Sequence, residues 1–577
     1  MPGPDPKKLE RLITNSGRIK DPGSVPGLLE SMADHASRRG LPNGFIEHAV
    51  NEALTTSDPE TALNRLVRIL VMIEDPAFHS LLEDPDGLKS LLAILGYSNY
   101  LSSLMLRSPA DYVWLMRDVG LSGKRTLAMM QKELAGAMGS STDMEGATRA
   151  LRRNKYREML RIGVRDLLGA ASLAETVHDI SNLAETSIDG AVTRVTDILR
   201  EKHGTPVYDT GGNITRPGKF SVLGLGKLGG EELNYSSDVD LLYVYSSHEG
   251  ATTGRPSASG GYRDSIENHR FFVRTGEMVT KLLNDRTEDG FVFRVDLRLR
   301  PEGESGEIAY SLASLEVYYQ SWGRTTDRLA LLKAKPVGGF RRLGEEFIGL
   351  MEPFVYRKHL DYSALEEVGA LKEKIDIHIG AAGEGINDIK LGRGGIREIE
   401  FLVQSLQLIN GGRNPVIRGR NTLQSIDRLM RNGYLTERDA ESLSSAYIFL
   451  RTVEHRVQLV EERQTHTLPA DQESLEKLAF AMGYSREGVG DRKTFEHALG
   501  KFTGMVQDSF DRLFSRGKVP ITGVCEEHVK LMSDDLSYEE AIAEMQGLGF
   551  ADPETGYRNL LLLRDGPEFG HFPDSCR

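Results

Sequence analysis

A glycine-rich turn followed by two aspartates at the start of an apolar strand constrains this chain more than any other feature. The turn spans Gly224–Gly230, and the aspartates are Asp238 and Asp240. Because side chains alternate across a strand, the two carboxylates are predicted to point to the same side. Neighbouring carboxylates repel each other, and a hard divalent cation relieves that repulsion. Since glycines let backbone N–H groups approach phosphates closely, the pattern predicts a site for Mg²⁺ and a nucleotide.

The glycine pattern alone is ambiguous. The glycines at 224, 226 and 229 satisfy G-x-G-x-x-G, which is also typical of dinucleotide-binding turns. Such a turn leads into a long helix with one acidic residue about 20 positions on, whereas here two acids follow sooner and open a strand. A P-loop is excluded because Leu228 follows Lys227, where that motif has Ser or Thr. The spacing therefore favours nucleotidyl transfer.

A third acidic residue lies in the segment Phe291–Pro301, where apolar and charged residues alternate. The alternation predicts a strand with one apolar face and one charged face, the latter formed by Arg294, Asp296, Arg298 and Arg300. An exposed sheet face with cross-strand ion pairs is the ordinary explanation for such a strand. Together with the paired aspartates, the pattern instead predicts Asp296 as a third metal ligand and Arg298 and Arg300 as phosphate clamps.

A second basic cluster precedes an apolar helix predicted from residue 396. Lys390, Arg393 and Arg397 surround three glycines at the start of that helix. A helix N-terminus favours anions, so the cluster predicts a second phosphate contact. A basic, glycine-rich turn without a ligand fits the same residues.

Three further basic residues are interpreted structurally. Lys333 and Lys335 end another predicted helix, where two lysines are typical of a solvated C-terminal charge pair. His455 lies on a long predicted helix between an acidic and a basic neighbour. We therefore predict a packed or ion-paired histidine and not a catalytic base.

The composition limits the class of protein. With 577 residues, the chain can form about three to four domains with a sizeable core. A net charge of −13 argues against a general nucleic-acid-binding protein, which normally carries a basic excess. The two cysteines, Cys525 and Cys576, are too few for a disulfide framework or a zinc cluster. No apolar run reaches the roughly 18 residues of a membrane span, and no signal-peptide core is present, so we expect a cytoplasmic enzyme without membrane contact.

The pattern of periodicity changes twice along the chain. Helical periodicity dominates residues 1–200 and returns after residue 311, with turn signals and β-type segments between. A Gly/Ser/Thr-rich stretch, 249–262, is expected to form a flexible loop beside the site. The sequence therefore indicates a mostly helical α+β protein. Helices are expected at 61–70, 87–95, 144–170, 189–202, 265–283, 436–464 and 493–514.

Three ordered motifs carry a resemblance to a known family. Gly224–Asp240, Arg294–Pro301 and Gly394–Phe401 resemble the glutamine synthetase adenylyltransferase/adenylyl-removing enzyme. The likeness covers most of the chain, from about residue 97 to residue 469. Members of this bifunctional family usually carry two nucleotidyltransferase halves, whereas this chain carries one.

Details of the motifs indicate which half is present. Leu233–Tyr235, Asp327–Lys335 and Ile396–Glu398 are similar to the N-terminal, adenylyl-removing half. The transfer half tends to have Thr-Asp at the positions of Arg397 and Glu398. Residues 547–567 resemble the beginning of the family's linker region, so we expect a fragment or a naturally shortened protein.

The resemblance also implies an architecture. A polymerase-β-like nucleotidyltransferase domain, with a mixed sheet and helices, is expected at 201–325. A helical region at 1–200 precedes it, and a helical bundle at 326–515 completes the active site. Residues 516–577 are expected to begin the linker or regulatory region, with the second catalytic half absent.

The activity implied by the resemblance is phosphorolytic removal of AMP from an adenylylated tyrosine of glutamine synthetase, which gives ADP. One or two Mg²⁺ ions, ATP or ADP, and inorganic phosphate are the expected cofactor and substrates, and a PII-type nitrogen regulatory protein is an expected partner. Asp238, Asp240 and Asp296 are the implied catalytic residues and metal ligands. The implied nucleotide and phosphate contacts are Gly226, Lys227, Ser237, Arg298, Arg300, Lys390, Arg393 and Arg397.

Three alternatives stay open. Adenylyl transfer from ATP to the same tyrosine uses the same ligands, with pyrophosphate as the leaving group. Uridylyl transfer to a PII-type protein belongs to a related fold, whose glycine turn more typically has Gly-Ser than Gly226-Lys227. A non-catalytic regulatory module has no need for three acids in one place, and it should show no Mg²⁺-dependent nucleotide binding.

Overall fold

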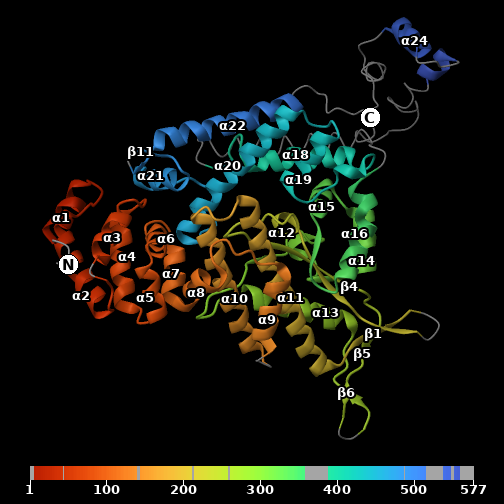
Figure 1. Ribbon diagram of the computed structural model, residues 1–577. Helices are drawn as coiled ribbons and strands as arrows, with labels where there is room; N and C mark the ends of the chain where they lie inside the picture. Colours follow the sequence, from red (N-terminus) through yellow and green to blue (C-terminus); the bar gives the residue numbers. More distant parts are fainter. Residues whose placement is uncertain are drawn as a thin grey trace.

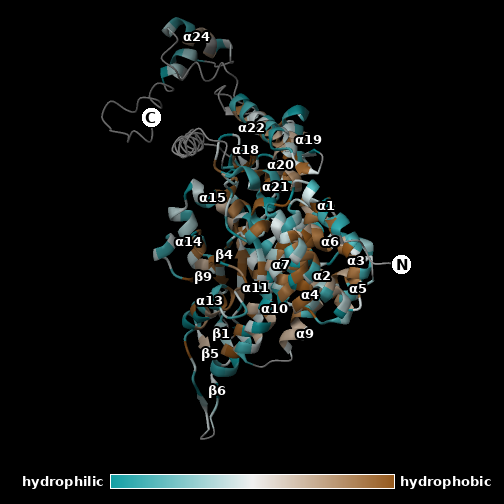
Figure 2. Ribbon diagram, turned by 90° about the vertical axis from the view of Figure 1, so that its left-hand side faces the viewer, coloured by the Kyte–Doolittle hydropathy of each residue, from teal (hydrophilic) through white to brown (hydrophobic). Residues whose placement is uncertain are grey.

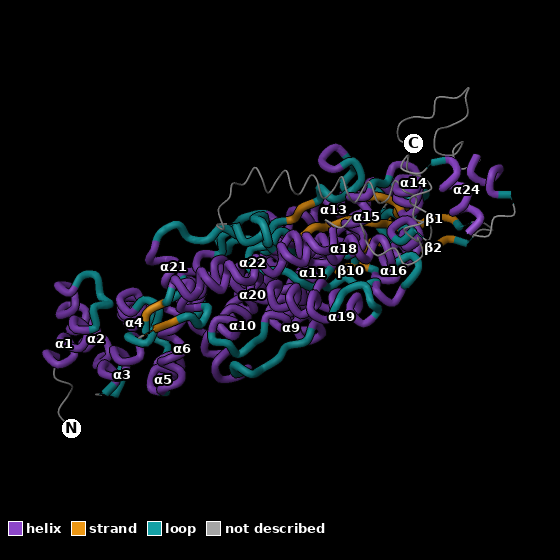
Figure 3. The backbone as a smooth tube through the Cα atoms, turned by 90° about the horizontal axis from the view of Figure 1, so that it is seen from above, coloured by secondary structure: helices purple, strands orange, loops and turns teal. Residues whose placement is uncertain are grey.

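The computed structural model describes residues 6–357, 388–514, 537–547 and 552–558, apart from positions 43, 140–142, 211–213, 258–259 and 487. The described residues are mostly helical, with small mixed sheets, which confirms the α+β class (Figure 1). Figure 3 shows the N-terminal helices at one end of an elongated molecule, with the longer strands toward the other end. Among the described residues, no helix is both long enough and apolar enough to span a bilayer.

The N-terminal region is a series of helices that begin at well-defined caps. Asp58, Asp75 and Asp84 each accept a hydrogen bond from a backbone amide of the following helix, and proline occupies the first helical position in each case. The helices are α1 (Pro6–Asn15), α2 (Val25–Arg38), α3 (Phe45–Ala53), α4 (Pro59–Met72), α5 (Pro76–Glu83), α6 (Pro85–Leu95), α7 (Asn99–Arg107), α8 (Pro109–Trp114), α9 (Leu127–Gly139), α10 (Met144–Leu167) and α11 (Leu173–His203), with a 3₁₀ turn at Pro22–Ser24 and a π-helical turn at Leu115–Val119.

Helix α11 begins 16 residues earlier than the sequence indicates. The expected start was residue 189, whereas the helix starts at Leu173 behind a capping box formed by Ser172 and Glu175. The added turns are rich in buried polar residues, which obscure the apolar periodicity. Two of them, Asp179 and Glu185, form ion pairs with distant arginines and lysines.

The main sheet has the order β10-β3-β4-β8, and β9 also pairs with β4. Strands β10, β3 and β4 are antiparallel, whereas β8 and β9 run parallel to β4, so the sheet is mixed. Because β10 lies beyond residue 325, the sheet extends past the expected end of the core. The strands are β3 (Phe220–Gly224), β4 (Val239–Tyr245), β8 (Val295–Asp296), β9 (Ala309–Ser311) and β10 (Lys335–Gly339).

Both faces of this sheet are covered by helices. Alternate residues of β4 pack on opposite sides: Leu241 and Tyr243 join the core with α11 and α13 (Asn268–Asn284), and Leu242 joins the core with α14–α16. This explains the nearly continuous apolar run of β4. Figure 2 shows hydrophobic residues gathered on the inward sides of the packed helices.

Two predictions around the sheet are wrong. The segment Phe291–Pro301 is a strand only at Val295–Asp296, because Val292 and Phe293 are both buried and the chain turns after residue 296. The 249–262 stretch carries short strands and lies beyond Tyr245, at the end of β4 opposite Asp240 (Figure 1). The short strands in this region are β1 (Pro206–Asp209), β2 (Thr215–Pro217), β5 (Ala251–Thr252), β6 (Arg255–Pro256) and β7 (Tyr262–Arg263).

A C-terminal helical bundle packs against the sheet and against the N-terminal helices. The central helix is α20, which lies within three residues of its expected bounds at both ends. Its backbone accepts hydrogen bonds from Tyr97 Oη and Ser98 Oγ, at the start of α7. The helices after the sheet are α14 (Leu312–Trp322), α15 (Thr325–Leu332), α16 (Arg341–Val355), α18 (Ile396–Asn410), α19 (Thr422–Arg431), α20 (Glu437–Glu461), α21 (Gln472–Ala481), α22 (Arg492–Phe514) and α24 (Tyr538–Gly547), with a 3₁₀ turn at Pro415–Ile417 and the short strands β11 (Ser485–Arg486) and β12 (Val489–Gly490). Most of the expected linker region, 516–577, lies outside the described residues.

Candidate active site

A cavity of about 490 Å³ lies between the start of β4, the glycine turn and the helical bundle. Its walls come from α12 (Gly226–Gly229), α15, α18 and α20, together with the loops before β4 and after β8. The cavity therefore brings together residues more than 200 positions apart in the sequence. Of the predicted site residues, those that line it are Gly226, Lys227, Ser237, Asp238, Asp240, Asp296, Arg298 and Lys390.

The three aspartates meet at one edge of the sheet. Asp240 and Asp296 are direct partners on the neighbouring parallel strands β4 and β8. Asp238 precedes β4 by one residue and lines the same cavity. Burial, reinforced by repulsion from Asp296 and then Asp238, raises the pKa of Asp240 to about 6. The arrangement thus concentrates negative charge where it is poorly solvated.

The glycine turn touches the aspartates directly. Gly226 has a φ of +51°, a conformation that L-residues other than glycine rarely adopt. A Cβ atom at this position would lie 2.6 Å from Asp240 Oδ2. Both the backbone conformation and the close approach therefore require glycine beside the carboxylates.

Lys227 projects from this turn into a buried ion pair with α20. Its Nζ lies 3.3 Å from Glu454 Oε1. Burial lowers the pKa of Lys227 to about 8, although Glu454 opposes the shift. Burial alone would raise the pKa of Glu454, but pairing with Lys227 and Arg451 lowers it to about 2. At neutral pH the ammonium of Lys227 and the carboxylate of Glu454 therefore form a charged pair in the wall of the cavity.

Arginines hold two of the carboxylates. Arg294 Nε donates to Asp238 Oδ1 at 2.5 Å, and Gln464 Nε2 donates to Asp238 Oδ2 at 3.1 Å. Asp296 accepts from the Arg298 guanidinium and also from the Arg298 backbone amide. Within the described residues, no three acidic, histidine or cysteine side chains converge closely enough to hold a metal as they stand.

The donor set nevertheless fits Mg²⁺. Three carboxylates line one cavity, and carboxylate oxygens are the ligands that this ion prefers. Burial, reinforced by repulsion from Asp296 and Asp238, raises the pKa of Asp240, and a cation at this edge would relieve the repulsion. Arg294 and Arg298 already occupy oxygens of Asp238 and Asp296 that such a cation would share.

Three expected phosphate contacts do not reach the cavity. Arg300 donates to the backbone oxygens of residues 297, 304 and 306. Its guanidinium therefore holds together the loop in which it lies. Arg393 is exposed and lies 3.7 Å from Asp511. Arg397 is also exposed and does not line the cavity. Of this second basic cluster, Lys390 alone lines the cavity.

Several cavity residues were missed by the sequence reasoning. Glu400 and Gln404 on α18, Glu454 and Gln458 on α20, and His466 beyond α20 all line the cavity. Glu400 Oε1 is buried without a hydrogen-bond partner. The available signal was its spacing, since Glu400 follows Ile396 by one helical turn on an otherwise apolar stripe.

The lysines after α15 are not a solvated pair as predicted. Lys333 is buried and donates to Glu232 Oε2 at 2.7 Å. Lys335 donates to Glu185 and Glu231. Both lysines therefore tie the sheet to neighbouring elements. His455 is fully buried 3.5 Å from Asp166, which confirms the prediction of a packed or paired histidine.

Known proteins share this part of the chain. Residues 88–349, which include the sheet and all three aspartates, match the model of the family described as glutamate-ammonia ligase adenylyltransferase. The chain is 36% identical to the bifunctional glutamine synthetase adenylyltransferase/adenylyl-removing enzyme of Pseudomonas aeruginosa, over 84% of this chain and 48% of that protein. It is 38% identical to the protein of the same description from Shewanella loihica, over 72% of this chain and 42% of that protein.

The chain belongs to this family. The resemblance inferred from the three motifs is thereby confirmed. A second family model, GlnD PII-uridylyltransferase, matches residues 370–514, which include α18, α20 and α22 of this adenylyltransferase-family chain. The chain spans about half the length of the curated relatives it matches.

Replacing Asp240 with asparagine is expected to stabilise the metal-free protein at neutral pH by roughly 1–3 kcal/mol. The folded protein keeps a proton on Asp240 up to pH of about 6, whereas the unfolded chain releases it near the ordinary carboxyl pKa. The ionisation of Asp240 therefore lowers the free energy of unfolding as the pH rises from the ordinary carboxyl pKa to about 6, and the full loss remains above that pH. Asparagine has no such ionisation and avoids this loss. Melting temperatures in EDTA should be higher for Asp240→Asn at neutral pH and should converge with the wild type below the ordinary carboxyl pKa. Equal melting at neutral pH would contradict the charge crowding described here.

Proposed function

We propose that this chain is a magnesium-dependent nucleotidyltransferase that removes AMP from an adenylylated tyrosine of glutamine synthetase by phosphorolysis. The observation that carries the proposal is the in-register pairing of Asp240 with Asp296, beside Asp238, in a cavity that includes the glycine turn. The mixed sheet with helices on both faces is consistent with a polymerase-β-like nucleotidyltransferase fold. A PII-type protein is the proposed regulatory partner, supported by the match of residues 370–514 to the GlnD PII-uridylyltransferase model.

The reaction exchanges one phosphorus–oxygen bond for another. An oxygen of inorganic phosphate bonds to the phosphorus of the adenylyl group, and the bond from that phosphorus to the tyrosine oxygen breaks. ADP forms, and the released tyrosine oxygen takes up a proton. Because a phenol has a pKa of about 10, the phenolate is a tolerable leaving group once positive charge is nearby. Little covalent work is required of the protein, so positioning and charge neutralisation provide the rate.

The residues of the cavity divide this work. Asp238, Asp240 and Asp296 would hold Mg²⁺, which supplies positive charge to the phosphoryl oxygens and the departing phenolate. Lys227 and Lys390 line the same cavity and attract the incoming phosphate. Arg298 is largely exposed, so its guanidinium can exchange the Asp296 carboxylate for a phosphate oxygen. The backbone at Gly226 lets the phosphate approach the aspartates closely.

Adenylyl transfer from ATP to the same tyrosine is the second candidate. The descriptions of the curated relatives name both activities, and this chain covers about half the length of each relative. The resemblance implies that the transfer half tends to have a tryptophan in the segment that corresponds to Asp327–Lys335. This segment has none, and together with the motif at Ile396–Glu398 this favours the removing half. The same aspartates serve either direction, so the assay below measures both.

Purified chain incubated with adenylylated glutamine synthetase, Mg²⁺ and inorganic phosphate is expected to release ADP and to reduce the mass of the synthetase by one AMP. ADP release should require phosphate and should stop in EDTA. AMP addition to unmodified synthetase with ATP, without phosphate-dependent ADP release, would reverse the proposed direction. Inactivity in both assays would contradict catalysis by this chain alone.

A further inference from the structure

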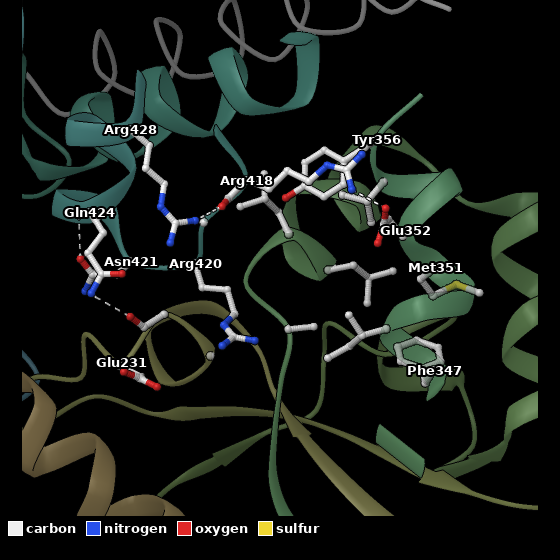
Figure 4. Close-up of a pocket in the computed structure, with 18 residues that line it drawn as sticks. Glu231, Phe347, Met351, Glu352, Tyr356, Arg418, Arg420, Asn421, Gln424 and Arg428 are labelled. Atoms are coloured by element: carbon white, nitrogen blue, oxygen red, sulfur yellow. Dashed lines mark hydrogen bonds and ion pairs between the residues drawn. The ribbon is translucent and has the colours of Figure 1, made fainter. Parts of the chain in front are cut away.

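A second pocket lies directly behind the glycine turn. Its volume is about 330 Å³, and its walls are α16, α19, the loop before α19 and the reverse side of α12 (Figure 4). It is separate from the catalytic cavity: Gly226 and Lys227 line the catalytic cavity, whereas Gly229 and Gly230 line this pocket. One turn of helix therefore stands between the two spaces.

One side of the pocket is basic. Arg418, Arg420 and Arg428 line it, with Asn421 and Gln424 beside them (Figure 4). Arg418 is already engaged, because its guanidinium pairs with Glu352 and donates to the Gly411 carbonyl.

The other two arginines are less constrained. Arg428 is exposed, and its guanidinium donates to the backbone oxygen of Arg418 (Figure 4). In the part of the chain that the structure describes, the Arg420 guanidinium makes neither a hydrogen bond nor an ion pair. The Arg420 guanidinium and the remaining donors of Arg428 can thus bind an anion.

The acidic residues of the pocket do not neutralise these arginines. Glu352 pairs with Arg418. Glu231 pairs with Lys335 and lies 3.5 Å from His178. The pocket therefore keeps a local positive charge in a protein whose net charge is −13.

The opposite side is apolar. Phe347, Met351 and Val355 of α16 line it, and Tyr356 adds an aromatic ring next to Arg418. In Figure 4 Phe347 and Met351 lie across the pocket from Arg420 and Arg428. A volume of this size suits a small molecule, and the two unlike walls suit one that has an anionic end and an apolar end.

We propose that this pocket binds a phosphorylated small molecule with an apolar or aromatic body. A planar guanidinium binds a phosphate through two parallel hydrogen bonds, and two such groups with no acidic partner match a dianion better than a single carboxylate. The apolar wall of α16 accepts the body of the molecule. The bound phosphate lies against the back of α12, opposite the catalytic cavity.

The position makes this a control site, a consequence that rests on the proposed function. Helix α12 is a single turn, with Lys227 on one side and Gly229 on the other. Helix α15 is shared in the same way, since Ala330 lines the catalytic cavity and Leu331 lines the pocket. A ligand that presses on either helix therefore changes the position of Lys227 and hence the rate.

Calorimetric titration of the whole chain with phenyl phosphate, in EDTA, tests binding without any activity. Arg420→Ala and Arg428→Ala are each expected to weaken binding about tenfold or more. Arg431→Ala removes the same charge from the exposed surface of α19 outside the pocket and should leave the affinity unchanged. Lys390→Ala, in the catalytic cavity, should also leave it unchanged. Melting temperatures show that each variant is folded.

Several outcomes would overturn the proposal. Equal weakening by Arg431→Ala would indicate a general charge effect. Loss of binding in Lys390→Ala alone would place the ligand in the catalytic cavity. Equal affinity for benzoate would reject a phosphate group, equal affinity for inorganic phosphate would reject the apolar wall, and no binding by the wild type would reject the site.

The rate of ADP release tests the control function separately. Phenyl phosphate is expected to change the rate in the wild type and in Arg431→Ala but not in Arg420→Ala. Binding without any change in rate would leave the pocket as a binding site and reject its control of catalysis. Absence of ADP release from the wild type would contradict the proposed function and not the pocket, because the calorimetric result stands alone.

Discussion

Asp238→Asn is expected to lower the rate of ADP release by about 10³-fold or more, because it removes a proposed metal ligand and the negative charge that pairs with Arg294. The substitution hardly changes the side-chain volume, and the remaining amide oxygen can still accept the 2.5 Å hydrogen bond from Arg294 Nε. The fold should therefore survive while Mg²⁺ affinity falls. Initial rates measured over a range of Mg²⁺ concentrations, with circular dichroism as a check on folding, provide the measurement.

Asp427→Asn is a matched control for this experiment. Asp427 is a surface aspartate on α19 that pairs with an arginine, as Asp238 does, but it lies outside both pockets. The control should keep the wild-type rate. Wild-type activity in Asp238→Asn would refute the assignment of the active site, and equal losses in the two variants would point to a general electrostatic effect.

Lys333→Met is expected to destabilise the protein by about 3–5 kcal/mol. Lys333 Nζ lies 2.7 Å from Glu232 Oε2, and both side chains are almost completely buried. Burial alone would lower the pKa of Lys333, but pairing with Glu232 raises it, so Lys333 is charged at neutral pH. Without the lysine, the Glu232 charge stays buried with only its hydrogen bonds from the Thr422 amide and hydroxyl. Urea unfolding monitored by tryptophan fluorescence and circular dichroism measures the loss.

A double variant separates charge from packing in this pair. Lys333→Met with Glu232→Gln removes both charges and should recover a large part of the lost stability. Arg431→Met breaks an exposed ion pair on α19 and should cost less than about 1 kcal/mol. If the double variant were no more stable than Lys333→Met, the loss would come from packing and not from an uncompensated charge.

The active-site aspartates were predictable because their signals are local. Asp238 and Asp240 are two residues apart at the start of an apolar run, and strand alternation alone places them on one side. Asp296 was predicted from the alternation of apolar and charged residues over Phe291–Pro301. The structure does not form a strand over this segment, since β8 contains only two residues. The position of Asp296 depends on its pairing with Asp240, and a charged residue between arginines was signal enough.

The buried ion pairs could not be predicted in this way, because their two partners are distant in the sequence. Lys333 resembles a solvated helix-end lysine until Glu232, 101 residues earlier, is placed beside it. Lys227 meets Glu454 across 227 residues. Arg300 looks like a phosphate clamp, yet nearby loop carbonyls occupy its donors. Local patterns thus predicted many of the elements and the three aspartates that line the cavity, whereas the buried ion pairs required the tertiary fold.

The place of α20 in the sequence determines when this protein can be completed during synthesis. The helix supplies Glu454 to the catalytic cavity and binds Tyr97, 359 residues earlier, through the carbonyl of Arg456. At translation rates of roughly 5–20 residues per second, Lys227 waits roughly 10–45 s for its partner Glu454 to be made. Until then the cations and carboxylates of the half-built cavity face water, and the N-terminal helices lack one of their neighbours. The nascent chain therefore completes the candidate active site late, after α20 has been synthesised and can pack against the sheet.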